Sequence, residues 1–281
     1  MNETERPKPG VIGSVSVAAG RLRRNPILLV GALVLTALGG IISLLGVVHP
    51  LLVNLTSIVW IVVWPFLIAG FLGMVVDART GPTRLGTFAT AGKANYLSML
   101  GATLLFAGII FGVIFFSFVL TFVLFLIVLA STAGELLEGG ITVLFVAATV
   151  LFVLPYLLIY LFVQFYDVGV VAGGERAVSS LTHSVSLVRQ NIPGVVGYTV
   201  VFILIQMIGY GPGYAVLFLG GVELTDAGGW RIVSASLFAV GSLLTLVFGT
   251  VAMALAFTYH VTFYEAISPD TGERASTDSS A

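Results

Sequence analysis

The sequence predicts an all-α protein: a polytopic membrane helix bundle of about six transmembrane helices, built as three repeats of an amphipathic helix plus a hairpin. The chain is 58% hydrophobic and only 9% charged, whereas soluble domains carry about 25% charged residues. Six apolar stretches have spanning length, since a transmembrane helix needs about 20 apolar residues. A short motif recurs before three of them, and self-similarity at fixed positions marks a structural unit.

The six predicted spans are long runs that charged residues do not interrupt. The 12 Lys and Arg and the 13 Asp and Glu residues lie between the runs or at their predicted cytoplasmic ends. Ion pathways usually need ionisable groups inside the bundle, so this distribution argues against an ion-coupled pump. The third run would reach about 50 Å as one helix, so it must tilt, bend or project from the bilayer. The spans cover residues 26–48, 51–76, 96–130, 141–166, 192–220 and 232–264.

The repeated motif is a basic residue, an asparagine two positions later, and a glycine six positions after the asparagine. The alternative is coincidence in a chain with 33 glycines, but the scarcity of basic residues favours a genuine repeat. The predicted units cover about residues 11–76, 81–166 and 175–265. The motif residues are Arg23, Asn25 and Gly31, then Lys93, Asn95 and Gly101, and then Arg189, Asn191 and Gly197.

Each motif is expected to form a hinge at the membrane surface. An amphipathic segment precedes it, most clearly where Leu181, Val185 and Val188 recur at helical spacing. The cation can meet a lipid phosphate and the last helix carbonyls. The asparagine is suited to ending one helix or capping the next. The predicted headgroup or interface residues are Arg23, Lys93, Arg189, Asn25, Asn95 and Asn191.

Charge predicts the orientation, because Lys and Arg are retained on the cytoplasmic side. With the N-terminus inside, Arg231 is the one basic residue placed outside. We therefore expect a protein of the cell membrane with both termini cytoplasmic. The membrane domain is predicted over residues 11–267, with disordered cytoplasmic segments at residues 1–10 and 268–281.

Two places inside or beside the spans are candidate sites. Gln164 and Asp167 share a helix face near the end of the fourth span, and His260 and Glu265 close the sixth. This polar cluster is interpreted either as a headgroup or ion site or, preferably, as interfacial anchoring. The segment Gly209–Gly213 is expected to break the fifth span near the outer surface, and broken helices can bind substrates in transporters.

Other chemistry finds no support in the sequence. There is no cysteine, which excludes disulfides and thiolate metal sites. His49, His183 and His260 are too widely separated to form a pair at metal-ligand spacing. No nucleotide-binding or hydrolase motif occurs, and a net charge of −1 gives no electrostatic basis for binding nucleic acid. We expect no cofactor, no metal and no enzymatic activity.

The segments Arg21-Leu-Arg-Arg-Asn-Pro26, Lys93-Ala-Asn95 and Arg189-Gln-Asn191 resemble those of uncharacterised haloarchaeal six-span integral membrane proteins. They are also similar to the membrane domain that precedes a glycerophosphodiester phosphodiesterase domain in some bacteria. The resemblance covers nearly the whole chain and implies the same six-span membrane fold. This chain lacks the phosphodiesterase domain, so the resemblance carries over neither lipid hydrolysis nor catalytic residues.

The leading functional prediction is a non-enzymatic membrane scaffold that interacts with membrane lipids, or with a membrane protein partner or a second copy of itself. The alternative is a transporter or permease subunit for a small neutral or amphiphilic solute. It requires a cavity lined by Asn54, Gln206 or the Gly209–Gly213 segment. A membrane enzyme comes third, and would need polar groups converging around Asp167 and His260.

Overall fold

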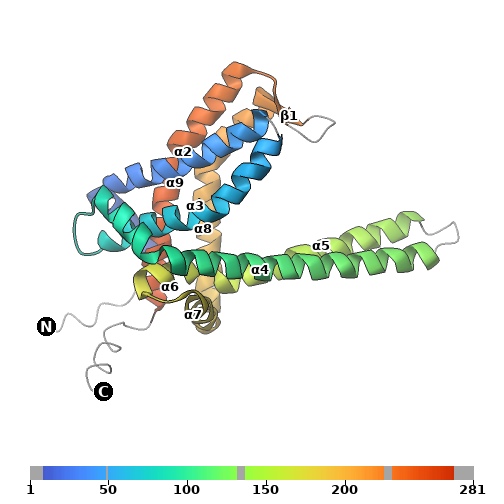
Figure 1. Cartoon of the computed structure of the whole chain (residues 1–281), viewed down its shortest axis with the longest axis horizontal. Coiled ribbons are helices and arrows are strands. Elements are labelled where there is room, and N and C mark those ends of the chain that lie inside the picture. The colour runs from blue at the N-terminus through green and yellow to red at the C-terminus, as the bar shows by residue number, and fades with distance from the viewer. Residues whose placement is uncertain (1–8, 49, 132–136, 225–229, 269–281) are drawn as a thin grey trace.

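The computed structural model describes residues 9–48, 50–131, 137–224 and 230–268 of the chain, and these residues are almost entirely helical (Figure 1). The all-α prediction is therefore confirmed. The predicted disorder of the two ends falls mainly on residues 1–8 and 269–281, which lie outside the described residues.

The described residues form helices α1 to α9. Five helical stretches are individually long and apolar enough to cross a membrane, and α1 with α2, bent by 100° relative to each other, counts as a sixth if the pair is one span. The helices are α1 (Val11–Arg24), α2 (Ile27–Val48), α3 (Pro50–Asp77), α4 (Leu85–Ser131), α5 (Leu137–Val163), α6 (Tyr166–Gly173), α7 (Ala177–Gln190), α8 (Ile192–Val216) and α9 (Ala235–Ile267).

The second amphipathic segment and the third span form one helix, so the hinge expected at Asn95 is wrong. Helix α4 runs without interruption for 47 residues, about 70 Å at the usual rise per residue. A proline explains the difference: Pro26 follows Asn25 directly, and Pro193 lies two positions after Asn191. Proline lacks an N–H donor and disfavours helical geometry in the preceding residue. Tyr96 follows Asn95, so nothing stops the helix there.

The break expected at Gly209–Gly213 is also wrong, because α8 stays helical to Val216. The two glycines instead allow α9 to approach closely. A Cβ atom on Gly209 would lie 2.1 Å from the Cβ of Ala252, and one on Gly213 would lie 2.0 Å from Thr245 Oγ1.

Helix α8 ends instead in a π-helical turn, Leu217–Gly221, where Gly220 has φ 159°. A two-stranded antiparallel ribbon follows, formed by β1 (Val222–Leu224) and β2 (Trp230–Ile232). The sequence did not predict this ribbon.

Helices α4 and α5 form an arm that extends away from the body made by α2, α3, α8 and α9 (Figure 1). Among the side chains described between residues 103 and 162, Ser117 alone is buried. Its hydroxyl donates a 2.7 Å hydrogen bond to the Leu151 carbonyl across the two helices of the arm. The remaining arm surface is exposed and almost entirely apolar, as expected of helices surrounded by lipid.

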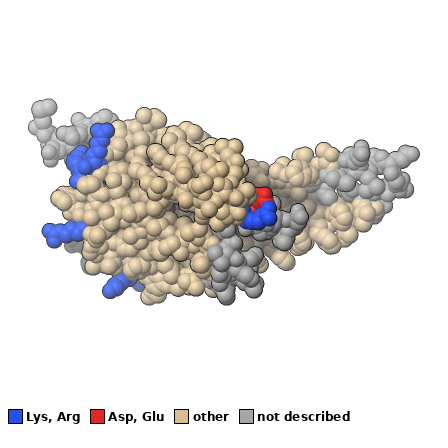
Figure 2. Space-filling view, turned by 90° about the horizontal axis from the view of Figure 1, so that it is seen from above, with Lys and Arg blue, Asp and Glu red and all other residues tan. Residues whose placement is uncertain are grey.

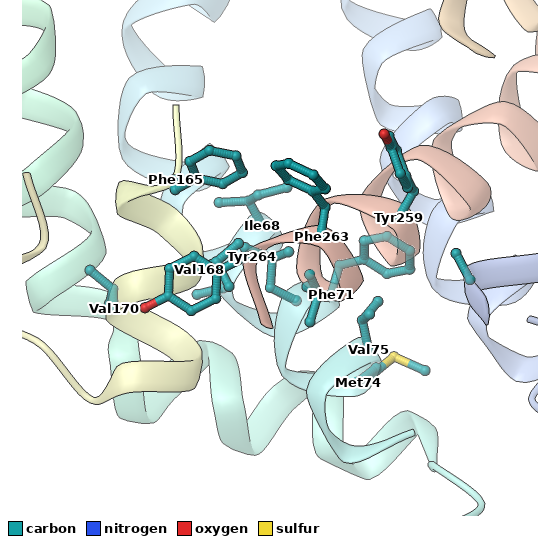
Figure 3. Close-up of a cluster of buried hydrophobic side chains, with 14 of the residues drawn as sticks. Ile68, Phe71, Met74, Val75, Phe165, Val168, Val170, Tyr259, Phe263 and Tyr264 are labelled. Atoms are coloured by element: carbon teal, nitrogen blue, oxygen red, sulfur yellow. The ribbon is translucent and has the colours of Figure 1, made fainter. Parts of the chain in front are cut away.

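The buried core includes the place where the C-terminal parts of α3 and α9 meet α6 (Figure 3). Phe71 and Val75 come from α3, Val168 from α6, and Phe263 and Tyr264 from α9. Both described chain ends lie at this end of the molecule (Figure 1). We call it the hinge end, and the opposite end, which carries β1 and β2, the ribbon end.

Candidate functional site

The three motif asparagines make the same local hydrogen bond. Each side-chain amide donates to the carbonyl four residues earlier, and in α1 and α7 that carbonyl belongs to the last helical turn. The Arg21 carbonyl also accepts a 3.0 Å hydrogen bond from the backbone N–H of Asn25. Asn25 and Asn191 therefore lie at the C-terminal ends of α1 and α7, whereas Asn95 lies within the continuous helix α4. The bonds run from Asn25 to Arg21 (3.3 Å), from Asn95 to Ala91 (3.0 Å) and from Asn191 to Leu187 (2.9 Å).

Asn25 has a second role that the other two asparagines lack. Its Oδ1 atom accepts a 3.0 Å hydrogen bond from the backbone N–H of Thr83. Asn25 is buried, so this bond satisfies a polar group that water does not reach. It fixes the α1–α2 bend against the connection between α3 and α4.

The three motif cations are exposed. None of them forms an ion pair with another residue within the described ranges. Arg23 and Arg189 lie in the last turns of α1 and α7, as predicted. Lys93 instead lies beside the middle of α3, where it lines a hollow of about 370 Å³ with Val62 and Phe66. The continuity of α4 explains this different placement.

The predicted polar cluster is divided among three sets of contacts. Asp167 and His260 meet, with Nε2 of the histidine 3.0 Å from Oδ1 of the carboxylate. Gln164 bonds instead to the Thr199 hydroxyl at 3.2 Å. Glu265 forms ion pairs with Arg21 at 2.8 Å and with Arg79 at 3.0 Å.

The pair of Asp167 and His260 continues into a buried triad. The Tyr198 hydroxyl is hydrogen-bonded to Nδ1 of His260, and His260 is only 4% exposed. A carboxylate oxygen accepts, so Nε2 of His260 donates to Asp167, and Nδ1 and the Tyr198 hydroxyl share the second hydrogen bond. Asp167 also accepts a 2.8 Å bond from the N–H of Val168. The triad joins α6, α8 and α9.

Aromatic rings enclose the triad. Phe165 stacks on His260 with ring centroids 5.2 Å apart, and Tyr198 stacks on Phe263 at 4.8 Å. Because both ring nitrogens of His260 are engaged and Phe165 covers its face, the arrangement stabilises helix packing. None of the three triad residues lines the hollow beside Lys93 or the larger cavity between α2, α3, α8 and α9.

Four members of these networks were not predicted from the sequence: Tyr198, Thr199, Arg21 and Arg79. Tyr198 did leave a signal, because a tyrosine within an apolar span needs a hydrogen-bond partner for its hydroxyl. The two arginines left none that could identify Glu265 as their partner. Their ion pairs depend on α9 returning to α1 and to the end of α3.

A lateral cavity of about 670 Å³ lies between α2, α3, α8 and α9, toward the ribbon end. Tyr210, from the segment expected to break, lines it; Gln206 does not. The side chain of Asn54 lies outside the described residues. No charged residue is among those lining the cavity: Leu35, Thr36, Ala37, Gly39, Gly40, Ile41, Leu44, Trp60, Trp64, Tyr210, Tyr214, Leu217, Phe218, Val222, Phe238, Ser242, Thr245, Leu246 and Met253.

Comparison with known proteins bears on the whole of this architecture. A family model described as "Domain of unknown function (DUF7847)" matches residues 10–267. The comparisons with curated proteins and with solved structures gave no match. Since the matched region runs from the start of α1 to the end of α9, the chain belongs to the DUF7847 family.

Proposed function

We propose that this protein is a non-enzymatic, multi-pass protein of the cell membrane that binds anionic lipid headgroups at its hinge end. One observation carries the proposal: Arg23 and Arg189 are exposed in the last turns of α1 and α7 and pair with no carboxylate in the described part of the chain. Arg21 and Arg79 differ from them, because each forms an ion pair with Glu265.

An anionic headgroup suits such positions. A Lys or Arg side chain near an anionic membrane surface contributes about 1 kcal/mol to the attraction. Phosphate oxygens can also take the charge-assisted hydrogen bonds that a guanidinium offers in a fork. By holding lipids or a partner at its hinge end, the protein would act as a scaffold.

The proposed orientation places the hinge end in the cytoplasm. On the face seen in Figure 2, most Lys and Arg side chains gather at the end where the chain termini lie. At the ribbon end Arg231 is paired with Glu223, which reduces the positive charge on that side. Both features support the positive-inside arrangement.

The proposal retains the threefold repeat. The first residue of a short helix packs against the motif glycine of the second unit and of the third unit. A Cβ atom on Gly101 would lie 3.0 Å from the Ala177 Cβ, and one on Gly197 would lie 3.3 Å from Val11. Val11 and Ala177 both lie 14 positions before their motif asparagine. Equivalent contacts between successive units support a common origin, as does the resemblance to haloarchaeal six-span proteins and to the domain that precedes the phosphodiesterase.

The test is the lipid profile of the purified protein. The triple variant Arg23→Gln, Lys93→Gln and Arg189→Gln should co-purify several-fold less anionic lipid than the parent when lipids are quantified by mass spectrometry. Arg231→Gln is the control, because it removes a cation at the ribbon end and should leave the profile unchanged. An unaltered profile in the triple variant would contradict the proposal.

A second candidate function, transport of a small neutral or amphiphilic solute, is favoured by the lateral cavity. Its test is uptake of uncharged solutes into proteoliposomes. Solute flux above that of protein-free vesicles, reduced when Tyr210→Trp narrows the cavity, would replace the scaffold proposal. Flux equal to that of protein-free vesicles would count against transport.

A further inference from the structure

We propose that the lateral cavity binds the hydrocarbon chain of a membrane lipid, entering from the side between α2 and α8. This inference is independent of the headgroup proposal, because the cavity lies toward the ribbon end and has no charged lining residue. It names a second lipid contact that recognises the chain instead of the headgroup.

The position of the cavity favours an occupant that comes from the bilayer. Three of its walls, α3, α8 and α9, belong to helices long and apolar enough to span the membrane, and the fourth, α2, qualifies together with α1. Ile41 on α2 is 52% exposed and Phe218 beyond α8 is 62% exposed, so the rim of the cavity is continuous with the surface that faces lipid. A lipid chain can therefore enter without leaving the hydrocarbon phase.

Aromatic rings form two of the walls. On α3, Trp60 and Trp64 have ring centroids 5.2 Å apart. On the other side, Tyr210 stacks on Tyr214 at 6.1 Å, and Tyr214 contacts Phe218 at 6.4 Å. Large rings offer extensive apolar contact area at little conformational cost. These walls suit an extended aliphatic chain.

Two hydroxyl groups in the lining are already satisfied within their own helices. Thr36 Oγ1 donates to the Ala32 carbonyl at 3.0 Å, and Thr245 Oγ1 donates to the Gly241 carbonyl at 2.9 Å. Because both hydroxyl hydrogens are used within the helices, these two threonines offer an occupant mainly their methyl groups. The lining also includes the hydroxyls of Tyr210, Tyr214 and Ser242 and two indole N–H groups, but its surface is mainly apolar. A mainly apolar site holds water poorly, so hydrocarbon is a better occupant than water or a polar solute.

The volume and the glycines provide the room. About 670 Å³ falls within the range of roughly 300–1,000 Å³ typical of ligand sites. Gly39 and Gly40 line the cavity, and a Cβ atom at either would meet nothing within 4 Å. An occupant that fills this space gains the dispersion contacts that the walls otherwise lack.

The same glycines give a matched test. Gly39→Leu and Gly40→Leu place a side chain in the cavity, whereas Gly108→Leu and Gly112→Leu place the same side chain on the arm, where a Cβ atom also meets nothing within 4 Å. All four positions lie inside helices, so each substitution favours the helix relative to glycine. Monodisperse elution and unchanged circular dichroism would confirm that each variant is folded.

Tryptophan fluorescence provides the measurement. In a Trp230→Phe background the other two of the three tryptophans, Trp60 and Trp64, remain, and both line the cavity. Detergent-solubilised full-length protein is titrated with phosphatidylcholine carrying brominated acyl chains, which quench a nearby indole. We expect saturable quenching, at least tenfold weaker apparent affinity in Gly39→Leu or Gly40→Leu, and no change in the two arm variants.

Several outcomes would overturn the inference. Quenching that rises without saturation would show only general contact with lipid, and equal affinity in cavity and arm variants would place binding elsewhere. Competition by glycerophosphocholine, which has the headgroup but no chains, would show headgroup recognition. A brominated fatty alcohol should quench as the phospholipid does, and the variant lacking Arg23, Lys93 and Arg189 should bind normally, which separates this result from the headgroup proposal.

Discussion

His260 shows how this protein accommodates polar atoms within an apolar interior. Both ring nitrogens have partners, Asp167 on α6 and Tyr198 on α8, and a buried polar group without a partner would cost about 1–3 kcal/mol. The two bonds join three helices, since His260 itself lies on α9. The histidine therefore has both partners only when all three helices are in place. The triad therefore makes the packing of α6, α8 and α9 specific as well as stable.

Tyr198→Phe tests this role. The substitution keeps the ring against Phe263 and removes the hydroxyl that is hydrogen-bonded to His260, so we expect a loss of about 1–3 kcal/mol and a lower melting temperature in detergent. Tyr214→Phe is the control, because Tyr214 is half-exposed and its described contacts are ring contacts. Equal melting temperatures for the two variants would rule out a stabilising triad.

The charge of Glu265 makes a comparable contribution at the hinge end. It pairs with Arg21 and Arg79, and its side chain is 18% exposed. Glu265→Gln should cost on the order of 1–2 kcal/mol, less than the 3–5 kcal/mol of a fully buried pair because water still reaches the site. Glu223→Gln removes a surface pair and should have little effect. Thermal unfolding at low salt compares them, and similar shifts would contradict the assignment.

Helices α1 and α7 end at their asparagines, whereas α4 passes through Asn95. The hinge therefore needs the proline that follows, at Pro26 or Pro193, as well as the asparagine. An asparagine amide that bonds four residues back is compatible with both outcomes. A rule based on the asparagine alone predicts three hinges, and a rule that includes proline predicts two.

The continuity of α4 predicts a long internal distance. The chain has no cysteine, so Gly86→Cys and Phe122→Cys would be the sole sites for spin labels. The 36 residues between them span about 54 Å in one straight helix. Pulsed electron paramagnetic resonance should give a narrow distribution near that value. A clearly shorter or broad distribution would indicate a hinge at Asn95 after all.

The sequence predicted the spans well because apolar length is a strong signal for helices in a membrane. It failed where neighbouring helices decide the outcome. Gly209 and Gly213 suggest a break when α9 is unknown, and they become close-packing positions once Ala252 and Thr245 lie against them. In the candidate site, Asp167 and His260 were foreseen as neighbours, whereas the pairing of Arg21 with Glu265 depends on the path of the whole chain.

At the scale of the whole molecule, both described chain ends lie on one side (Figure 1). The first helix ends beside the last, since Arg21 contacts Glu265, and the ribbon lies at the opposite end (Figure 1). A chain that crosses the membrane an even number of times also has both ends on the same side. The arrangement therefore predicts that the termini share a compartment and that the connection between β1 and β2 lies in the other.

Compartment-specific reporters can test this arrangement. A tag at either terminus should be accessible from the cytoplasm, and a tag between β1 and β2 should be accessible from outside, because moving the cations of the hinge end across the bilayer is costly. Tags on the two termini that report different sides would refute it. The same experiment with Arg231→Gln should give the same result, since the proposed orientation already places that residue outside.

The arm of α4 and α5 has a consequence for the surrounding membrane. Two helices that stand apart are wetted by lipid on nearly every side, so this 29.6 kDa chain needs a larger shell of boundary lipid than a compact bundle of equal mass. It should also sweep a wider area as it rotates in the bilayer plane. In a crowded membrane the protein would diffuse like a bulkier neighbour, and a small number of copies could keep other proteins at a distance.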